Sequence, residues 1–209
     1  YGPAETARRS DAAGGGGLAV SSASATFTLN GGPLTISAKV TGAGRVNVTG
    51  AGSLVLNNDA NDFTGILYKQ NGGFIQVSSI KNSGVASAAG AGSEVGIGVN
   101  GQIVYVGAGD STNRTLRLTG AGTFELANNG SGALVWTGTI NTSAVTGTRT
   151  LTISGSNTGA NEVQGAIADP GGANILGVTK NGVGSWILSG GNTYTGTTSV
   201  TAGTLQIGS

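Results

Sequence analysis

One repeated pattern, which is complete near the C-terminus, constrains the fold of this 209-residue chain more than any other feature. Residues 178–207 alternate short runs of strand-forming residues with corners built from glycine and asparagine. A looser copy occupies residues 49–77, where Asn61 to Gly65 aligns with Asn192 to Gly196, and residues 119–136 hold a partial third copy. A unit of this length buries its apolar side only by stacking on similar units, so the pattern predicts a repeat architecture.

The alternation of strand and corner predicts an all-β fold, a single-stranded parallel β-helix (β-solenoid) that we expect to be right-handed. About nine or ten coils of roughly 20 residues would stack at the usual strand spacing of about 4.8 Å. Residues 83–93 have the weakest pattern and are expected to form a loop excursion. A β-sandwich also needs many short strands, but it does not explain why one motif recurs. The residues expected to point inward and to form apolar columns include Leu54, Leu56, Leu118, Phe124, Leu126, Trp186, Leu188, Leu205 and Ile207.

Composition supports one elongated β domain. Charged residues make up 9% of the chain and proline occurs three times, so the sequence lacks the composition of a disordered protein. Its 41 glycines and many threonines and asparagines disfavour helices. We predict a solenoid domain over residues 25–209 and a polar N-terminal arm over residues 1–24, which would lie either on its own solenoid or on a neighbouring subunit.

The inventory of side chains removes most catalytic classes, because the chain has no histidine and no cysteine. Ser-His-Asp triads, Cys-His dyads and histidine-bound zinc are therefore excluded. Two carboxylate clusters remain: Asp59 with Asp62, and Asp110 with Arg114 and Arg117. A glycosidase needs two carboxylates facing each other across a cleft, whereas Asp59 and Asp62 lie in an Asn- and Asp-rich corner. We predict a non-enzymatic protein without catalytic residues.

Three further motifs have ordinary structural explanations. Residues 107–110 resemble one calcium-binding glycine-aspartate turn, but that motif acts through repetition. Gly182 and Gly184 resemble the start of a dinucleotide-binding loop, yet the third glycine is missing and a strand follows. No metal or cofactor is therefore predicted. Glycosylation sequons are expected by chance in a chain this rich in Asn, Ser and Thr, and they begin at Asn47, Asn113, Asn129 and Asn141.

The aromatic side chains offer two interpretations. They could form a surface on which carbohydrate stacks, or they could fill the core and the corners between coils. The equivalence of Phe63 and Tyr194 in the two repeat copies favours the second interpretation. The residues concerned are Phe63, Tyr68, Tyr105, Trp136, Trp186 and Tyr194.

Charge and hydropathy limit the possible partners. The net charge is +1 and the basic residues are scattered, which argues against nucleic-acid binding. No apolar run approaches the roughly 20 residues that a membrane-spanning helix requires, so no membrane span is predicted.

Residues 178–207 also resemble the passenger-associated repeat of bacterial autotransporters. The residues that carry the resemblance are Lys180, Gly182, Gly184, Trp186, Leu188, Ser189, Gly190, Asn192, Thr193, Tyr194, Thr195, Gly196, Thr197, Thr198, Val200, Gly203, Thr204 and Leu205. The resemblance implies export from a Gram-negative-type cell, an extracellular or outer-surface location, and a role as a rigid stalk, adhesin or fibre.

Within that range we predict a structural subunit of an extracellular filament. The run at residues 204–207 has no evident polar cap after it, and an open sheet edge can template another chain. Head-to-tail stacking, with residues 1–24 laid on the neighbour, would cover that edge. The alternatives are a monomeric passenger or adhesin domain that binds a cell surface or a glycan, and a carbohydrate-active β-helix enzyme.

Overall fold

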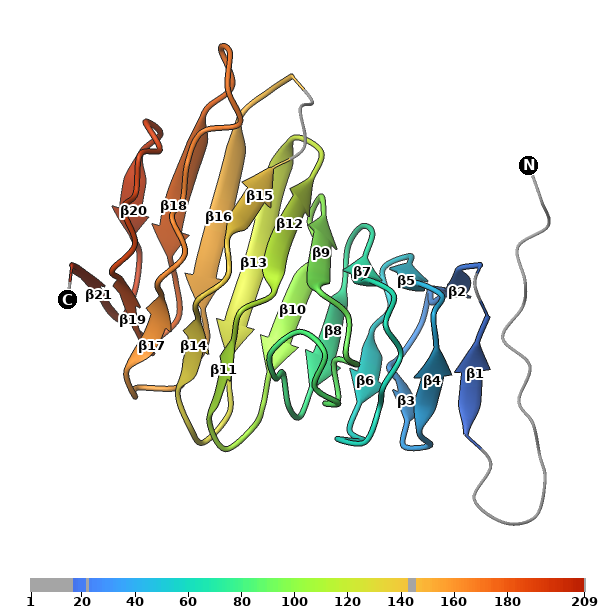
Figure 1. Ribbon diagram of the computed structural model, residues 1–209. Coiled ribbons are helices and arrows are strands. Elements are labelled where there is room, and N and C mark those ends of the chain that lie inside the picture. Colours follow the sequence, from blue (N-terminus) through green and yellow to red (C-terminus); the bar gives the residue numbers. More distant parts are fainter. Residues whose placement is uncertain (1–16, 22, 143–145, 209) are drawn as a thin grey trace.

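The computed structural model describes residues 17–21, 23–142 and 146–208, which form a β-solenoid without helices (Figure 1). The longest sheet has eight strands, in the order β20 (Thr198–Val200), β18 (Leu176–Lys180), β16 (Arg149–Ser154), β13 (Gly122–Asn128), β10 (Gln102–Tyr105), β8 (Phe74–Val77), β6 (Leu54–Leu56) and β3 (Leu34–Ile36). The six-stranded sheet contains β15 (Ile140–Thr142), β12 (Thr115–Thr119), β9 (Glu94–Gly98), β7 (Leu67–Lys69), β5 (Val46–Thr49) and β2 (Ala25–Thr28).

Two smaller sheets complete the coils. The five-stranded sheet contains β11 (Asp110–Thr112), β14 (Leu134–Trp136), β17 (Asn161–Val163), β19 (Ser185–Leu188) and β21 (Thr204–Ile207). A two-stranded sheet pairs β1 (Leu18–Val20) with β4 (Val40–Gly42). The pairings between these strands are parallel, as a solenoid requires. The predicted all-β parallel β-solenoid is therefore confirmed, and its right-handed sense stays a prediction.

The number of coils differs from the expectation. The longest sheet has eight strands, which gives about eight turns rather than nine or ten. The coils also differ in length. The coil that leads from Leu54 to its partner Ile75 has nearly the expected size, whereas the coil from Ile75 to its partner Ile103 is clearly longer. The longer coil contains the excursion between β8 and β9, which confirms the loop expected over residues 83–93.

Apolar columns run through the interior, because alternate strand residues point inward and are stacked in register. One column contains Leu54, Ile75, Ile103, Leu126 and Ile153, all at most 1% exposed. The inward positions predicted from Leu54 to Leu188 are buried.

The last coil departs from that prediction. Leu205 is only partly buried and Ile207 is 65% exposed, because no further coil packs on β21 within the described residues. Val200 in β20 is also exposed. Within the described residues, the last coil therefore lacks the neighbour that would cover its inward-pointing side chains.

The asparagine of the repeat joins successive coils. Asn61 is fully buried, and its Oδ1 accepts a hydrogen bond from the backbone N–H of Val40 at 2.7 Å. Its counterpart Asn192 accepts one from the N–H of Ile167 at 2.9 Å. At the corner, where the backbone hydrogen bonds between stacked strands are interrupted, the short amide side chain thus supplies a hydrogen bond between coils instead.

Two buried lysines hold other corners. The Nζ of Lys69 donates to the carbonyl oxygens of Gly50 at 2.7 Å and Asn71 at 3.0 Å. The Nζ of Lys180 donates to the carbonyls of Asn181, Gly182 and Ala202. Burial lowers the pKa of both ammonium groups below the ordinary lysine value. Each lysine therefore satisfies backbone carbonyls that face inward at a turn.

Most of the predicted arm lies outside the described residues. Within residues 1–24, β1 pairs with β4, so the hydrogen-bonded stack includes residues 18–20. The division at residue 24 stays a prediction.

No membrane-spanning helix is present in the described part of the chain.

Candidate functional site

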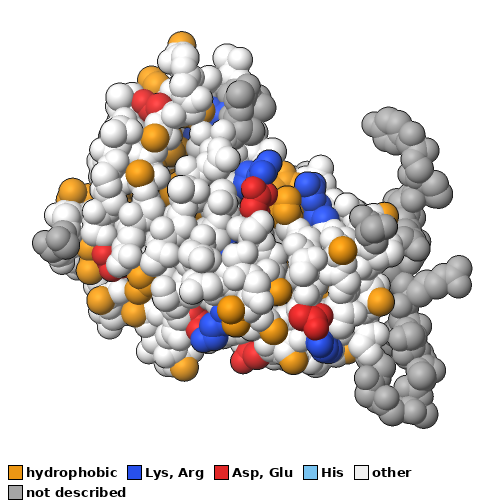
Figure 2. All heavy atoms as spheres, viewed as in Figure 1, with side chains coloured by type: hydrophobic (Ala, Val, Ile, Leu, Met, Phe, Trp, Pro, Cys, Tyr) orange, Lys and Arg blue, Asp and Glu red, His pale blue; other side chains and the backbone are white. Residues whose placement is uncertain are grey.

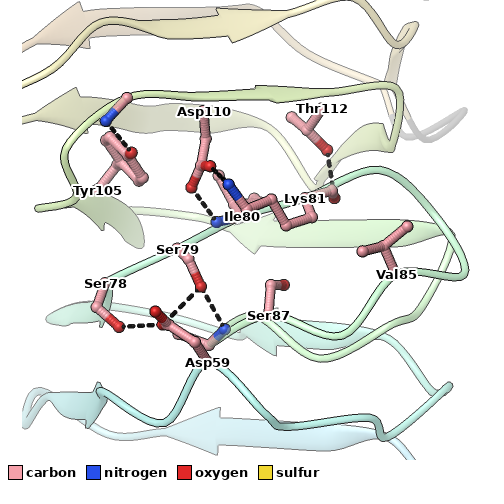
Figure 3. A network of polar contacts seen from close by, with 12 residues as sticks. Asp59, Ser78, Ser79, Ile80, Lys81, Val85, Ser87, Tyr105, Asp110 and Thr112 are labelled. Carbon is pink, nitrogen blue, oxygen red and sulfur yellow. Dashed lines mark hydrogen bonds and ion pairs between the residues drawn. The ribbon is translucent and has the colours of Figure 1, made fainter.

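The excursion between β8 and β9 is held by a network of polar contacts (Figure 3). Residues 81–86 are exposed, whereas residues 87–92 are buried against the solenoid. The base of the excursion lies between Asp59 of the preceding coil and Asp110 of the following one. The excursion is therefore a fixed loop with an exposed tip.

The side chain of Arg114 anchors this loop. The side chain is 1% exposed, and its Nε donates to the carbonyl oxygen of Lys81 at 2.8 Å. Nη1 donates to the carbonyl of Ala89 at 3.0 Å, and Nη2 donates to that of Gly90 at 2.6 Å. Burial lowers the pKa of the guanidinium to about 10. One planar guanidinium thus binds the backbone at the start of the loop, at Lys81, and near its end, at Ala89 and Gly90.

Asp110 and Asp59 hold the base of the loop. The Asp110 carboxylate accepts the N–H of Ile80 at 2.9 Å and forms an ion pair with Lys81. Asp59 accepts the hydroxyls of Ser78 at 2.8 Å and Ser79 at 2.7 Å. The side chain of Asp110 is 2% exposed, and burial of such a charge requires the partners that it has here.

Tyr105 completes this network. Its hydroxyl oxygen accepts the N–H of Gly109 at 2.8 Å. Burial, together with the nearby Asp110 charge, raises the pKa of the phenol to about 12, although the hydrogen bond from Gly109 acts in the opposite direction. The phenol is therefore neutral at physiological pH and serves as a structural group.

The structure does not assemble the two carboxylate clusters as the sequence placed them. Asp62 pairs with Lys39 at 2.6 Å rather than facing Asp59 in a shared site. Arg117 pairs with Glu94 at 2.6 Å, and neither it nor Arg114 binds Asp110. Asp59 and Asp110 instead hold the same segment from opposite sides. The arrangement explains these carboxylates as loop anchors, and the predicted absence of catalytic residues stays a prediction.

The remaining motifs also have structural roles. In the turn that resembles a calcium-binding turn, the Asp110 carboxylate already accepts the N–H of Ile80 and pairs with Lys81, as described above. Gly182 lies in the corner that Lys180 holds. Within the described residues, no group of three or more His, Cys, Asp or Glu side chains is placed to hold a metal ion. Two sequon asparagines brace neighbouring coils: Asn113 accepts the N–H of Ser83, and Asn129 accepts that of Ser156.

The aromatic side chains divide into two groups. Phe63, Tyr105, Trp136 and Trp186 are at most 1% exposed, which agrees with their interpretation as core filler. Tyr68 and Tyr194 are only partly buried. These two residues are therefore partly exposed to solvent, a difference that the sequence did not reveal.

A second excursion, between β17 and β18, is tied to the C-terminal repeat by Asp169. Its Oδ1 accepts the N–H of Leu176 at 2.8 Å, and its Oδ2 accepts the hydroxyl of Thr195 at 2.7 Å. The hydrogen bond from Leu176, followed by that from Thr195, holds the pKa of Asp169 below its ordinary value of 3.8.

Acid is expected to release this second excursion. A carboxylate with a lowered pKa contributes its full stabilisation above the unfolded value of 3.8 and loses it as the pH falls through the lower folded value. The amides of Leu176 and Thr195 should stay protected from hydrogen exchange at pH 5 and should begin to lose protection only as the pH falls below 3.8 toward the lower folded value. The Asp169→Asn variant should lack this step. A step near pH 6, or one that persists in the variant, would contradict the assignment.

Two segments of the chain match the family model described as the passenger-associated-transport-repeat, residues 46–76 and 178–207. The first segment runs from the start of β5 into β8, and the second runs from within β18 to the end of β21. The resemblance predicted from residues 178–207 is thereby confirmed.

A curated relative shares the repeat region more broadly. The chain is 36% identical over 140 residues to the adhesin BmaC autotransporter of Brucella suis biovar 1 (strain 1330). The alignment covers 64% of this chain and 4% of the relative, so the chain spans a small part of the relative's length. No solved structure matches the chain.

Proposed function

We propose that this chain, which carries two passenger-associated-transport-repeats, is a non-catalytic β-solenoid segment of an autotransporter adhesin passenger displayed on a bacterial cell surface. The observation that carries the proposal is the position of the two repeats, each of which supplies one full coil of the stack and part of the next. The similarity to an autotransporter adhesin supports an extracellular or cell-surface location.

The chemistry of the chain supports this role. The carboxylates singled out as catalytic candidates bind loop backbone, serine hydroxyls or lysines. The stacked coils satisfy the backbone polar groups between strands, so the solenoid supports loops and an outer face without disulfides. A rigid scaffold with exposed loops suits recognition rather than turnover.

Surface display tests the proposal. The chain would be inserted as the passenger between an export signal and a translocator in a non-adherent host, and then probed with external protease and with antibody. We expect intact cells to expose a folded chain whose core resists protease and to adhere more strongly than cells that display an unrelated β-solenoid. A chain that stays inside the cell, or one that is displayed unfolded, would overturn the proposal.

The filament hypothesis rests on a different observation, the apolar last coil. Val200 is 52% exposed and Ile207 is 65% exposed, so another layer of strands could cover them. Either a second copy or further coils of a longer polypeptide would do so, and neither the repeat nor the relative supports a filament. If copies stack head to tail, the mass measured by light scattering should rise with concentration and fall to the monomer in the Val200→Lys, Ile207→Lys variant. A monomer at all concentrations would exclude self-stacking.

A further inference from the structure

The outer face of the six-stranded sheet carries a row of residues that, apart from Arg117, take no part in the contacts described above. The register places one outward residue of each strand in line, because alternate residues point outward. The row consists of Thr26, Asn47, Tyr68, Gly96, Arg117 and Asn141. Figure 2 shows basic, acidic and hydrophobic side chains gathered over the part of the molecule where Figure 1 places β5, β7, β9 and β12.

Tyr68 is the centre of this row. Its ring occupies the space that a side chain at position 96 would fill, since a Cβ on Gly96 would lie 2.3 Å from Tyr68 Cδ2. The guanidinium carbon of Arg45 lies over the ring, 5.4 Å from its centroid. Glycine at 96 and arginine at 45 therefore fix the ring on the outer face, where it is partly exposed.

Arg45 differs from the other basic residues that the structure describes. Lys39, Lys81 and Arg117 each pair with a carboxylate. The buried Lys69, Arg114 and Lys180 bind backbone carbonyls, and Arg149 is buried as well. Arg45 is exposed and has no carboxylate partner among the described residues. Its planar donor group is available for an external carboxylate.

The amides beside Tyr68 are weakly engaged. Asn47 Nδ2 lies 3.4 Å from the Thr26 hydroxyl and 3.3 Å from Gln70 Oε1, both long for hydrogen bonds. Asn47 Oδ1 is buried without a hydrogen-bond partner in the described structure. Such a group is costly to leave unsatisfied. Because Oδ1 is buried, the atom of Asn47 that a ligand can engage is Nδ2, which can donate to a ligand hydroxyl in place of Gln70 Oε1.

From these observations we propose that the face formed by Arg45, Asn47, Tyr68 and Gln70 binds a carboxylate-bearing sugar unit of a glycan. The tyrosine ring contacts the C–H side of the sugar, the two amides exchange hydrogen bonds with its hydroxyls, and Arg45 pairs with its carboxylate. One unpaired cation matches one carboxylate, whereas a nucleic acid or another polyanion requires a basic stripe. The inference rests on the proposed adhesin function and names its ligand class.

Binding of acidic sugars by the purified chain tests the inference. The probes are 3′-sialyllactose and a glucuronic-acid disaccharide, each beside its neutral counterpart, titrated while the amide and side-chain NMR signals of Asn47 and Gln70 are followed. We expect Kd values on the order of 1 mM for such a shallow face. The neutral sugars should bind at least about tenfold more weakly, because they lack the carboxylate.

Three variants locate the site. Arg45→Met and Tyr68→Ala should each weaken acidic-sugar binding at least about tenfold, while Lys39→Met, which removes another exposed cation, should leave it unchanged. Circular dichroism checks that each variant keeps the solenoid. Absence of binding by both acidic probes, equal binding of neutral sugars, or undiminished binding by the folded Arg45→Met variant would each overturn the inference. The surface-display experiment is scored independently of sugar binding, so the two proposals can fail separately.

Discussion

Replacement of Arg114 by alanine is expected to lower the free energy of unfolding by about 3 to 5 kcal/mol. The change removes a side chain that is 1% exposed and leaves a cavity beneath the loop. It also removes the guanidinium donors from the carbonyl oxygens of Lys81, Ala89 and Gly90. The Lys81 and Gly90 carbonyls keep the hydroxyls of Thr112 and Ser87 as donors, so the Ala89 carbonyl loses the most. Lost hydrogen bonds and lost packing act in the same direction, which makes this one of the two largest effects that we expect.

Chemical denaturation measures the change, and Arg117→Ala provides the matched control. Arg117 is also a guanidinium, but its side chain is 43% exposed and pairs with Glu94 at the surface. The control should therefore cost no more than about 1 kcal/mol. Arg114→Ala should also speed proteolysis within residues 81–86, the exposed tip. Equal stability losses in the two variants, with an unchanged cleavage pattern, would show that Arg114 does not anchor the loop.

Alternation of residue type was sufficient to predict that stacked strands form the coils, but not how many coils there are. In β6 and β12 the inward leucines alternate with outward residues, and the register stacks Leu116 on Val95 and Leu54 on Ile75. The repeat predicted the corners as well, since Asn61 and Asn192 join coils in the same way. These features follow from local periodicity, which is visible in a single sequence.

The loop anchor could not be predicted in the same way. Arg114 binds backbone carbonyls of Lys81 and Gly90, which lie far from it along the chain, and a carbonyl carries no residue-specific signal. The sequence instead suggested a pairing with Asp110, its neighbour along the chain, but the fold turns that carboxylate toward Ile80 and Lys81. A coil brings residues together by stacking, so nearness in the chain is a poor guide to contacts between coils.

The candidate sugar-binding face shows the same limit. Tyr68 looked equivalent to the other aromatic residues, and the difference arises from Gly96 of the following coil, which pairs with Tyr68 and leaves space for the ring. The phase of the strand, with Leu67 and Lys69 inward, does predict that Tyr68 points outward. The length of the intervening loop, which decides which residue stacks on Tyr68, cannot be read from the pattern alone.

Substitution of Gly65 by alanine is expected to destabilise the solenoid by about 3 kcal/mol. Gly65 is the glycine that ends the Asn61 corner of the repeat. A Cβ at this position would lie 2.1 Å from the carbonyl oxygen of Gly44 and 2.7 Å from the amide nitrogen of Arg45 in the preceding coil. Both obstacles are backbone atoms, so relief requires that the coils move apart and that neighbouring strand bonds lengthen.

Gly31→Ala isolates this packing effect from the general cost of removing a glycine. Gly31 has no atom within 4 Å of a Cβ and does not have a positive φ, so its substitution should change stability by no more than about 0.5 kcal/mol. Denaturation of both variants in parallel gives the comparison. Similar stabilities would mean that the coils tolerate a wider spacing at this corner. A loss of stability in Gly65→Ala alone would instead show that glycine recurs here because the stacked backbones approach closely. The conformation of Gly65 is not the reason, since its φ is not positive.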